Sequence, residues 1–170
     1  MLITASATVD EAERHLLDLG GGNHTDNMRQ IRAHERLYRA DLAEADFWQL
    51  VFLETATTAR LTHANHDRRL RMIAEAARAF GYPRLGPNWD LHEIRGWTEA
   101  ARAGLPHLRL PALLLRDARG SELQFGRWYL QDGSHRALGY ATCLLDGNLR
   151  YTNQIVLLAT NHAYEPGSAA

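Results

Sequence analysis

The sequence predicts an α+β fold, and two observations lead to this prediction. Residues 1–80 carry most of their apolar side chains at the three- and four-residue spacing of amphipathic helices. Residues 88–160 instead contain short apolar runs bounded by turn residues, as strands do, and one longer segment of helical composition. We therefore expect a helical N-terminal region followed by a region in which strands and helices alternate.

The composition is that of an ordinary globular protein. The chain has 170 residues, of which 45% are hydrophobic and 23% charged, and its net charge is −1. This length suits one domain, or a small α/β unit with a helical appendage. Arginine supplies all of the positive charge, because the sequence contains no lysine. A nucleic-acid-binding protein usually shows a basic surplus, so the charge disfavours nucleic acid as a partner.

Cysteine usage and hydropathy predict a cytoplasmic protein. The single cysteine, Cys143, cannot form an internal disulfide, which fits a reducing compartment. No signal peptide is visible at the N-terminus, and the longest apolar runs are far shorter than a membrane span. We expect no membrane partner.

Four helical segments are expected in the first half. Thr8 and Glu11 have the spacing of a capping box, which predicts a helix start there. Residues 24–29 read as a loop or a second helix start, and residues 30–40 are compatible with a helix. Residues 47–54 predict a buried helix that continues to residue 61, although a strand is also compatible with so short a run. A last helix is expected over residues 62–80, with its apolar face at Leu70, Ile73, Ala74 and Ala77.

The clearest break in the chain is Gly81–Pro87, which holds two prolines and two glycines. We place a boundary there, between a helical region 1–82 and an α/β domain 88–162, and expect the two to pack as one compact unit. After the boundary we expect strands at 91–95, 112–116, 125–131 and 155–159. Helices are expected at 97–103 and 134–145, a hairpin near 117–121, and a disordered tail at 165–170.

The most informative stretch is Arg127–Thr142. An apolar run ends at Asp132-Gly133, and Ser134, His135 and Arg136 open the predicted helix 134–145. The first N–H groups of a helix attract anions, Gly133 permits close approach, and an arginine suits phosphate. The stretch therefore predicts a phosphate or carboxylate cradle. The alternative is an ordinary turn, in which Asp132 or Ser134 caps the helix and Arg136 forms a surface ion pair.

The pattern Tyr-x-x-Asp-Gly-x-His-Arg, followed by small and apolar residues, resembles the ParB/sulfiredoxin superfamily. Two flanking stretches extend the resemblance over about residues 88–160. Asp90–Arg95 is similar to the opening strand of that family, and Leu110–Arg116 is similar to its proline followed by an apolar strand, with a hairpin turn at Arg119-Gly120. The resemblance implies a small mixed sheet with helices, preceded here by the helical N-terminal region.

The resemblance also implies a function. By this resemblance, the phosphates of ATP or a related nucleotide would bind to Gly133, Ser134, His135 and Arg136. The nucleotide would bind together with Mg²⁺. Family kinases phosphorylate small molecules, so a small polar metabolite is the expected substrate, with Asp132 and His135 as catalytic residues. Family kinases also place a catalytic glutamate near the first strand. Glu93 and Glu99 are the candidates for it, and either one is equally readable as a solvated surface residue.

Other functions stay open at this point. A nucleotide-sensing or adaptor protein would bind nucleotide without turnover, and some ParB-like domains are labelled nucleases. Chromosome partitioning is disfavoured, since too little chain follows the motif for a helix-turn-helix domain. Ser134 stands where sulfiredoxins carry their reactive cysteine, which argues against their chemistry. The sequence leaves a homodimer open.

Two further groups of residues are candidates with simple alternatives. His63, His66 and Asp67 could lie together on a helix and bind a metal, but a polar helix face explains them as well, so we predict no metal site. The aromatic residues Phe47, Trp48, Phe52 and Trp97 are expected in the core, whereas Trp89 and Trp128 could flank the nucleotide site. Cys143 is expected to be a buried, inert thiol.

Overall fold

The computed structural model describes residues 1–18, 24–53, 68–81, 89–103, 113–116 and 128–170. The helices in these ranges are α1 (Val9–Asp18), α2 (His24–Ala33), α3 (Glu44–Gln49), α4 (Leu70–Phe80), α5 (Trp89–Arg102) and α6 (Ser134–Leu145). The strands are β1 (Leu2–Ser6), β2 (Arg36–Leu42), β3 (Val51–Phe52), β4 (Leu113–Arg116), β5 (Tyr129–Leu130) and β6 (Gln154–Thr160). The α+β class expected from the sequence is confirmed.

The strands form one mixed sheet in the order β1-β2-β6-β4-β5-β3. Neighbours pair antiparallel except β4 with β6 and β3 with β5, which pair parallel. Strands from both sides of the boundary expected at Gly81–Pro87 therefore share one sheet. Residues 82–88 themselves lie outside the described ranges.

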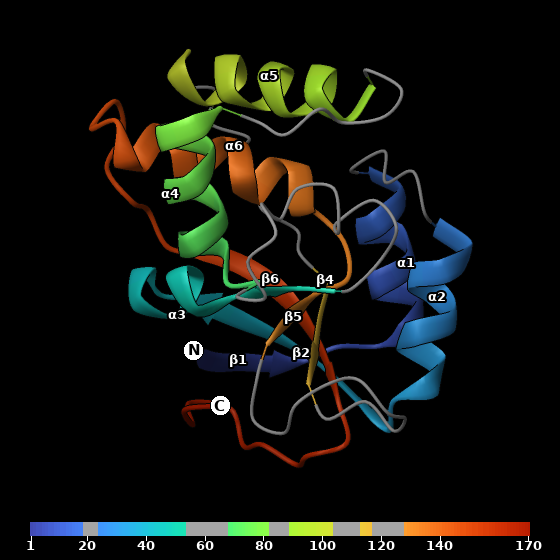
Figure 1. Cartoon of the computed structure of the whole chain (residues 1–170). Helices are drawn as coiled ribbons and strands as arrows, with labels where there is room; N and C mark the ends of the chain where they lie inside the picture. Colours follow the sequence, from blue (N-terminus) through green and yellow to red (C-terminus); the bar gives the residue numbers. More distant parts are fainter. Residues whose placement is uncertain (19–23, 54–67, 82–88, 104–112, 117–127) are drawn as a thin grey trace.

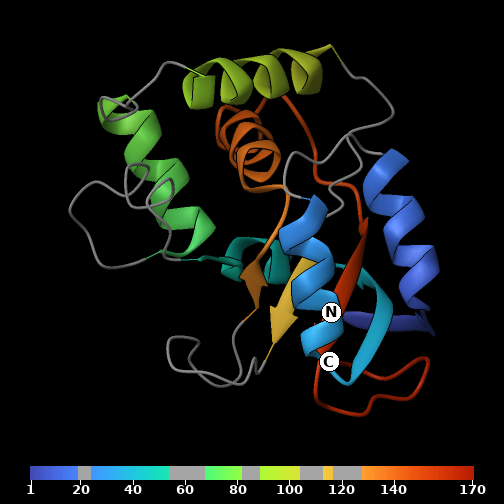
Figure 2. The same cartoon turned by 90° about the vertical axis from the view of Figure 1, so that its right-hand side faces the viewer.

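Helices cover both faces of this sheet (Figures 1 and 2). Side chains alternate along a strand, so neighbouring residues enter different cores. On one face, Tyr38 and Leu158 join a core that includes buried residues of α3, α4, α5 and α6. On the other, Leu37 and Leu157 join a core with buried residues of α1 and α2.

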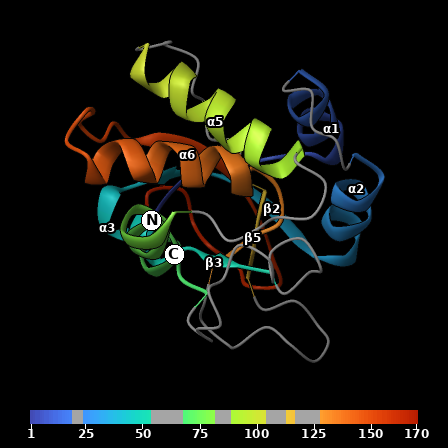
Figure 3. The same ribbon diagram turned by 45° about the horizontal axis from the view of Figure 1, so that its top comes forward.

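Helix α6 lies on the sheet, and α5 lies along α6 (Figure 3). The two helices run in the same direction, because Glu93 meets His135 near their starts and Arg102 meets Asp146 near their ends. A glycine permits the contact. A Cβ atom on Gly139 would lie 3.1 Å from the Thr98 nitrogen and 3.2 Å from the Ile94 oxygen.

The expected start of the first helix is confirmed. The Thr8 amide donates to the Glu11 carboxylate at 2.8 Å, and the Glu11 amide donates to the Thr8 hydroxyl at 3.2 Å, which completes a capping box. Ala12 and Leu16 are buried as expected, but Leu17 is 58% exposed. The polar stretch from His24 begins α2 rather than a loop.

Helices prevail among the described residues of the first half, but this half also supplies strands β1, β2 and β3, which the sequence did not predict. The second part of the helix expected over residues 30–40 is strand β2. Strand β2 pairs on both sides and is covered on both faces, so its apolar residues do not alternate simply. One helix was expected from residue 47 to residue 61. Helix α3 instead ends at Gln49, and the chain continues as strand β3.

Helix α4 confirms the predicted apolar face, since Leu70, Ile73, Ala74 and Ala77 are all buried. The helix begins at Leu70, however, because Arg69 is extended and bridges to Val51. The earlier part of the helix expected from residue 62 lies outside the described residues.

The strand expected at residues 91–95 was wrong. Trp89–Arg102 is one continuous helix, α5. Its buried residues Ile94 and Ala101 are seven positions apart, which is about two helical turns. Both therefore lie on the face of α5 that packs into the core with α6. The similarity of Asp90–Arg95 to the opening strand of the ParB/sulfiredoxin superfamily therefore does not extend to its structure.

The remaining elements of the second half agree with the sequence. Strands β4 and β5 pair antiparallel, α6 spans the predicted Ser134–Leu145, and β6 contains the predicted strand 155–159. The hairpin expected near 117–121 lies outside the described residues. The tail expected to be disordered is ordered instead, because it pairs with the edge strand β1 through Ile3 N–H to Ser168 O at 3.0 Å and Ala170 N–H to Met1 O at 3.0 Å.

A search of the described helices for one both long enough and apolar enough to cross a bilayer finds none.

Replacing Gly139 with alanine is expected to destabilise the protein by about 1–3 kcal/mol, because the new methyl group would push α5 away from α6. Gly96→Ala is the matched control, since a Cβ atom there meets nothing within 4 Å on the exposed side of α5. It should stabilise the protein by about 0.5–1 kcal/mol through helix propensity. Urea unfolding of both variants measures the difference, and equal effects would contradict the close contact.

Candidate functional site

The predicted cradle lies where β5 leads into α6. Gly133 has φ 88° and ψ 16°, a left-handed conformation that glycine adopts without strain. It occupies the position before the helix, and no side chain caps this end among the described residues. The capping role considered for Asp132 or Ser134 is therefore not observed. The N-terminus of α6 keeps the positive end of its dipole uncompensated by a side-chain cap.

Arg136 lies inside the protein. Its guanidinium is 3.5 Å from the Asp132 carboxylate and 4.9 Å from the centre of the Trp97 ring, and its side chain is 8% exposed. The surface ion pair considered for Arg136 is therefore wrong. A buried guanidinium between a carboxylate and an indole is a positioning group, which holds the Asp132 turn to helices α5 and α6.

Burial shifts the pKa values of both members of this pair. Desolvation raises the pKa of Asp132, and the charge of Arg136 only partly opposes the shift. Desolvation also lowers the pKa of Arg136, against the opposing effect of Asp132. Each charged group therefore depends on the other, and neither is a freely exposed ligand.

Asn27 completes the surroundings of Asp132, a role that no sequence pattern predicted. It belongs to α2, is fully buried, and accepts a hydrogen bond from Gln131 at 3.4 Å. The nearby Asn27 amide group also lowers the pKa of Asp132. The Asn27 Nδ2 atom is buried and makes no hydrogen bond to any described group. A polar residue in a polar helix sequence carries no mark of burial, so only the tertiary structure reveals it.

The structure brings one of the two candidate glutamates to the motif. Glu93 Oε2 of α5 lies 2.8 Å from Nδ1 of His135. The Glu93 side chain is 49% exposed and that of His135 is 18% exposed, so the carboxylate reaches solvent while the imidazole is largely covered. Glu99 lies farther along α5 and lines a separate cavity near the C-terminal end of α6.

The other candidate residues lie in or near the core, or outside the described residues. Phe47, Phe52 and Trp128 are buried, whereas Trp97 is partly exposed and contacts Arg136. Cys143 is buried and burial raises the pKa of its thiol, as an inert thiol requires. His63, His66 and Asp67 are not described, nor is the side chain of Trp89. Within the described residues, no three histidine, cysteine or acidic side chains gather as a metal site.

The chain matches no known protein family, no curated protein and no solved structure.

Removing the Arg136 charge is expected to make stability depend on pH through Asp132. In Arg136→Met the buried Asp132 carboxylate loses its counter-charge, so its pKa should rise further above the ordinary value of 3.8. A raised pKa in the folded state means that the folded protein binds more protons, so stability falls as pH rises from the unfolded to the folded pKa. The loss relative to the native protein should therefore grow as pH increases from about 4 to 7.

The double variant Arg136→Met/Asp132→Asn isolates this effect, because it keeps His135 and Glu93 but has no carboxylate at position 132. Urea unfolding at several pH values should show the extra pH dependence only in the single variant. The same slope in both variants would contradict the pairing of Asp132 with Arg136.

Proposed function

We propose that the protein is a nucleotide-dependent phosphotransferase, which uses ATP or a related nucleotide with Mg²⁺ to phosphorylate a small polar metabolite. One observation carries the proposal. In the described part of the chain, no side chain caps the N-terminus of α6 after the left-handed Gly133, and the Glu93–His135 pair lies beside it. Anion binding and a nearby proton acceptor are the two requirements of phosphoryl transfer that a protein supplies.

The phosphates would bind the backbone of α6 rather than the Arg136 side chain. The first N–H groups of a helix point along its axis toward a ligand, and the helix dipole adds to their attraction. Gly133 lacks a side chain that would obstruct the approach. Arg136 contributes indirectly, because it holds Asp132 and thereby the turn.

The chain order around the turn supports the resemblance to the ParB/sulfiredoxin superfamily. An apolar strand (β4) pairs antiparallel with the strand that enters the Asp-Gly-Ser-His-Arg motif (β5), and the motif opens α6. The family strand expected at residues 90–95 is the feature that this chain lacks, since those residues belong to α5.

Glu93 is the residue best placed to accept a proton. Its carboxylate is half exposed, and its close contact with His135 Nδ1 holds its orientation. The substrate hydroxyl oxygen would bond to the terminal phosphorus as the bond to the nucleoside diphosphate breaks, and the hydroxyl proton would pass to Glu93. Asp132 is largely buried and paired with Arg136, so it serves to position the turn.

Magnesium needs few protein ligands at such sites, because it commonly binds nucleotide phosphates with one or two carboxylates. Of the two described carboxylates beside the motif, Glu93 is substantially exposed and Asp132 is largely buried. No three histidine, cysteine or acidic side chains gather in the described part of the chain. We therefore propose that Mg²⁺ binds as a complex with the nucleotide.

Ser134→Asp should weaken nucleotide binding without harming the fold. A carboxylate at the first position of α6 favours the helix dipole but repels phosphate, so the affinity should fall at least about tenfold while thermal stability is maintained. Ser134→Asn is the neutral control of equal size and should bind like the native protein. Calorimetric titration with ATP, ADP and CTP, each with Mg²⁺, measures these affinities. If none of the three binds the native protein, the phosphate cradle is refuted.

Glu93→Gln should slow phosphoryl transfer about 10²-fold or more while nucleotide affinity stays within about twofold, because it removes a proton acceptor and keeps the shape. Glu99→Gln, on the same helix but away from the motif, is the matched control and should leave both unchanged. Phosphorus-31 NMR of ATP with hydroxylated metabolites measures the transfer. Binding without any turnover would instead indicate a nucleotide sensor or adaptor.

A further inference from the structure

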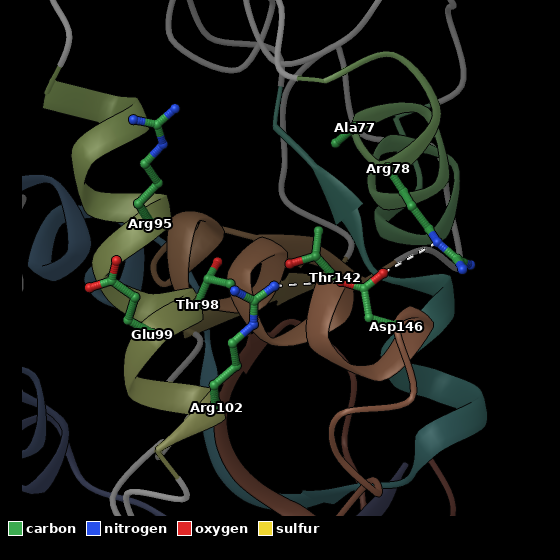
Figure 4. Close-up of a pocket in the computed structure, with 8 residues that line it drawn as sticks. All are labelled: Ala77, Arg78, Arg95, Thr98, Glu99, Arg102, Thr142 and Asp146. Carbon is green, nitrogen blue, oxygen red and sulfur yellow. Dashed lines mark ion pairs between the residues drawn. The ribbon is translucent and has the colours of Figure 1, made fainter.

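A cavity lies away from the Asp132–Arg136 motif, over the C-terminal half of α6 (Figure 4). It has a volume of about 350 Å³ and is bordered by α4, α5 and the end of α6. The residues that line it are Ala77, Arg78, Arg95, Thr98, Glu99, Arg102, Thr142 and Asp146. No residue of the motif is among them, so the cavity is independent of the proposed phosphotransfer site.

Two arginines from different helices converge at one end of this cavity. Arg78 of α4 lies 3.3 Å from the Asp146 carboxylate, and Arg102 of α5 lies 3.7 Å from it. Both arginine side chains are more than half exposed, at 56% and 53%. A carboxylate is therefore already held here, by groups that solvent reaches and a ligand can recruit.

Asp146 is a weak competitor for these arginines. It follows the last residue of α6, where the negative end of the helix dipole disfavours a carboxylate. Its side chain is 34% exposed, and it must serve both cations. A ligand carboxylate could share or replace it without breaking a buried pair.

The cavity has a third arginine. Arg95 lies two turns before Arg102 on α5 and also lines the cavity, and its guanidinium points away from Asp146 and Arg102 (Figure 4). Glu99, between them on α5, directs its carboxylate away from Asp146 and Arg102. Three arginines and two carboxylates line the cavity, so its lining carries one excess positive charge.

The middle of the cavity offers hydrogen-bond acceptors. The Thr98 hydroxyl donates to the Ile94 carbonyl at 2.7 Å, and the Thr142 hydroxyl donates to the Gly139 carbonyl at 2.8 Å. A hydroxyl has one donor hydrogen, so each threonine oxygen has only acceptor capacity left. A ligand that fits between the arginines gains from a hydrogen-bond donor at its centre.

We infer that this cavity binds a small dicarboxylate that carries a hydroxyl group. One carboxylate pairs with Arg78 and Arg102, the other pairs with Arg95, and the hydroxyl donates to Thr98 or Thr142. The volume is at the low end for small-molecule sites, which suits a ligand of this size.

Calorimetric titration with L-malate, succinate and L-lactate tests this assignment. L-Malate has both carboxylates and the hydroxyl, succinate lacks the hydroxyl, and L-lactate lacks the second carboxylate. The affinities should fall in the order malate, succinate, lactate. Absence of saturable malate binding, or lactate binding as tight as malate, would overturn the inference.

Three variants locate the binding. Arg102→Gln should weaken malate binding about tenfold or more, because it removes a charged hydrogen-bond donor. Asp146→Asn should tighten binding, because it releases both arginines from their internal competitor. Arg71→Gln is the control on α4, where Arg71 pairs with Glu75 at 2.8 Å outside the cavity, and it should change nothing. Equal affinity in Arg102→Gln and the native protein would refute the site.

The two proposed sites can fail separately. Ser134→Asp at the motif should leave malate affinity unchanged, and Asp146→Asn should leave nucleotide affinity unchanged. Nucleotide binding without malate binding would overturn only the dicarboxylate site, and the reverse result would overturn only the phosphate cradle.

Discussion

The close contact between α5 and α6 is the constraint on which both sites depend. It requires Gly139, because any side chain there would meet the Thr98 backbone nitrogen at 3.1 Å. With the helices at this distance, Glu93 reaches His135 at one end of α6 and Arg102 reaches Asp146 at the other. One packing contact thus assembles the motif site and the separate cavity.

The two ends of α6 are electrostatically different. At the N-terminus no side chain caps the helix among the described residues, and the two carboxylates beside the turn, Asp132 and Glu93, are paired with Arg136 and His135. At the C-terminus, Asp146 opposes the dipole and is balanced by Arg78 and Arg102. We propose that the first arrangement provides an anion site and that a ligand displaces the carboxylate of the second.

Local patterns in the sequence predicted local structure well. The capping box at Thr8 and Glu11 marked the start of α1, and the polar cluster after Gly133 marked the start of α6. Strand β2 was missed because burial on both faces removes the period-two pattern. The strand expected at residues 91–95 was wrong because it followed the similarity to a family strand. The apolar residues of this stretch, Leu91 and Ile94, are three apart, as on one face of a helix.

The candidate site shows the same division. The Asp-Gly-Ser-His-Arg turn and its helix could be read from the sequence, as could Glu93 as one of two glutamates. The burial of Arg136 against Trp97, and the contribution of Asn27 from α2, depend on contacts between distant segments. Charge type in a sequence does not tell whether an arginine faces a ligand or the interior.

The central claim is that the backbone at the start of α6 binds phosphate. It is tested most directly by nitrogen-15 NMR of the native protein titrated with ATP and Mg²⁺. We predict saturable shifts of the amide signals of Ser134, His135 and Arg136, because their N–H groups would change hydrogen-bond partner. Saturable binding that leaves these three amides unchanged, or no binding at all, would contradict the claim.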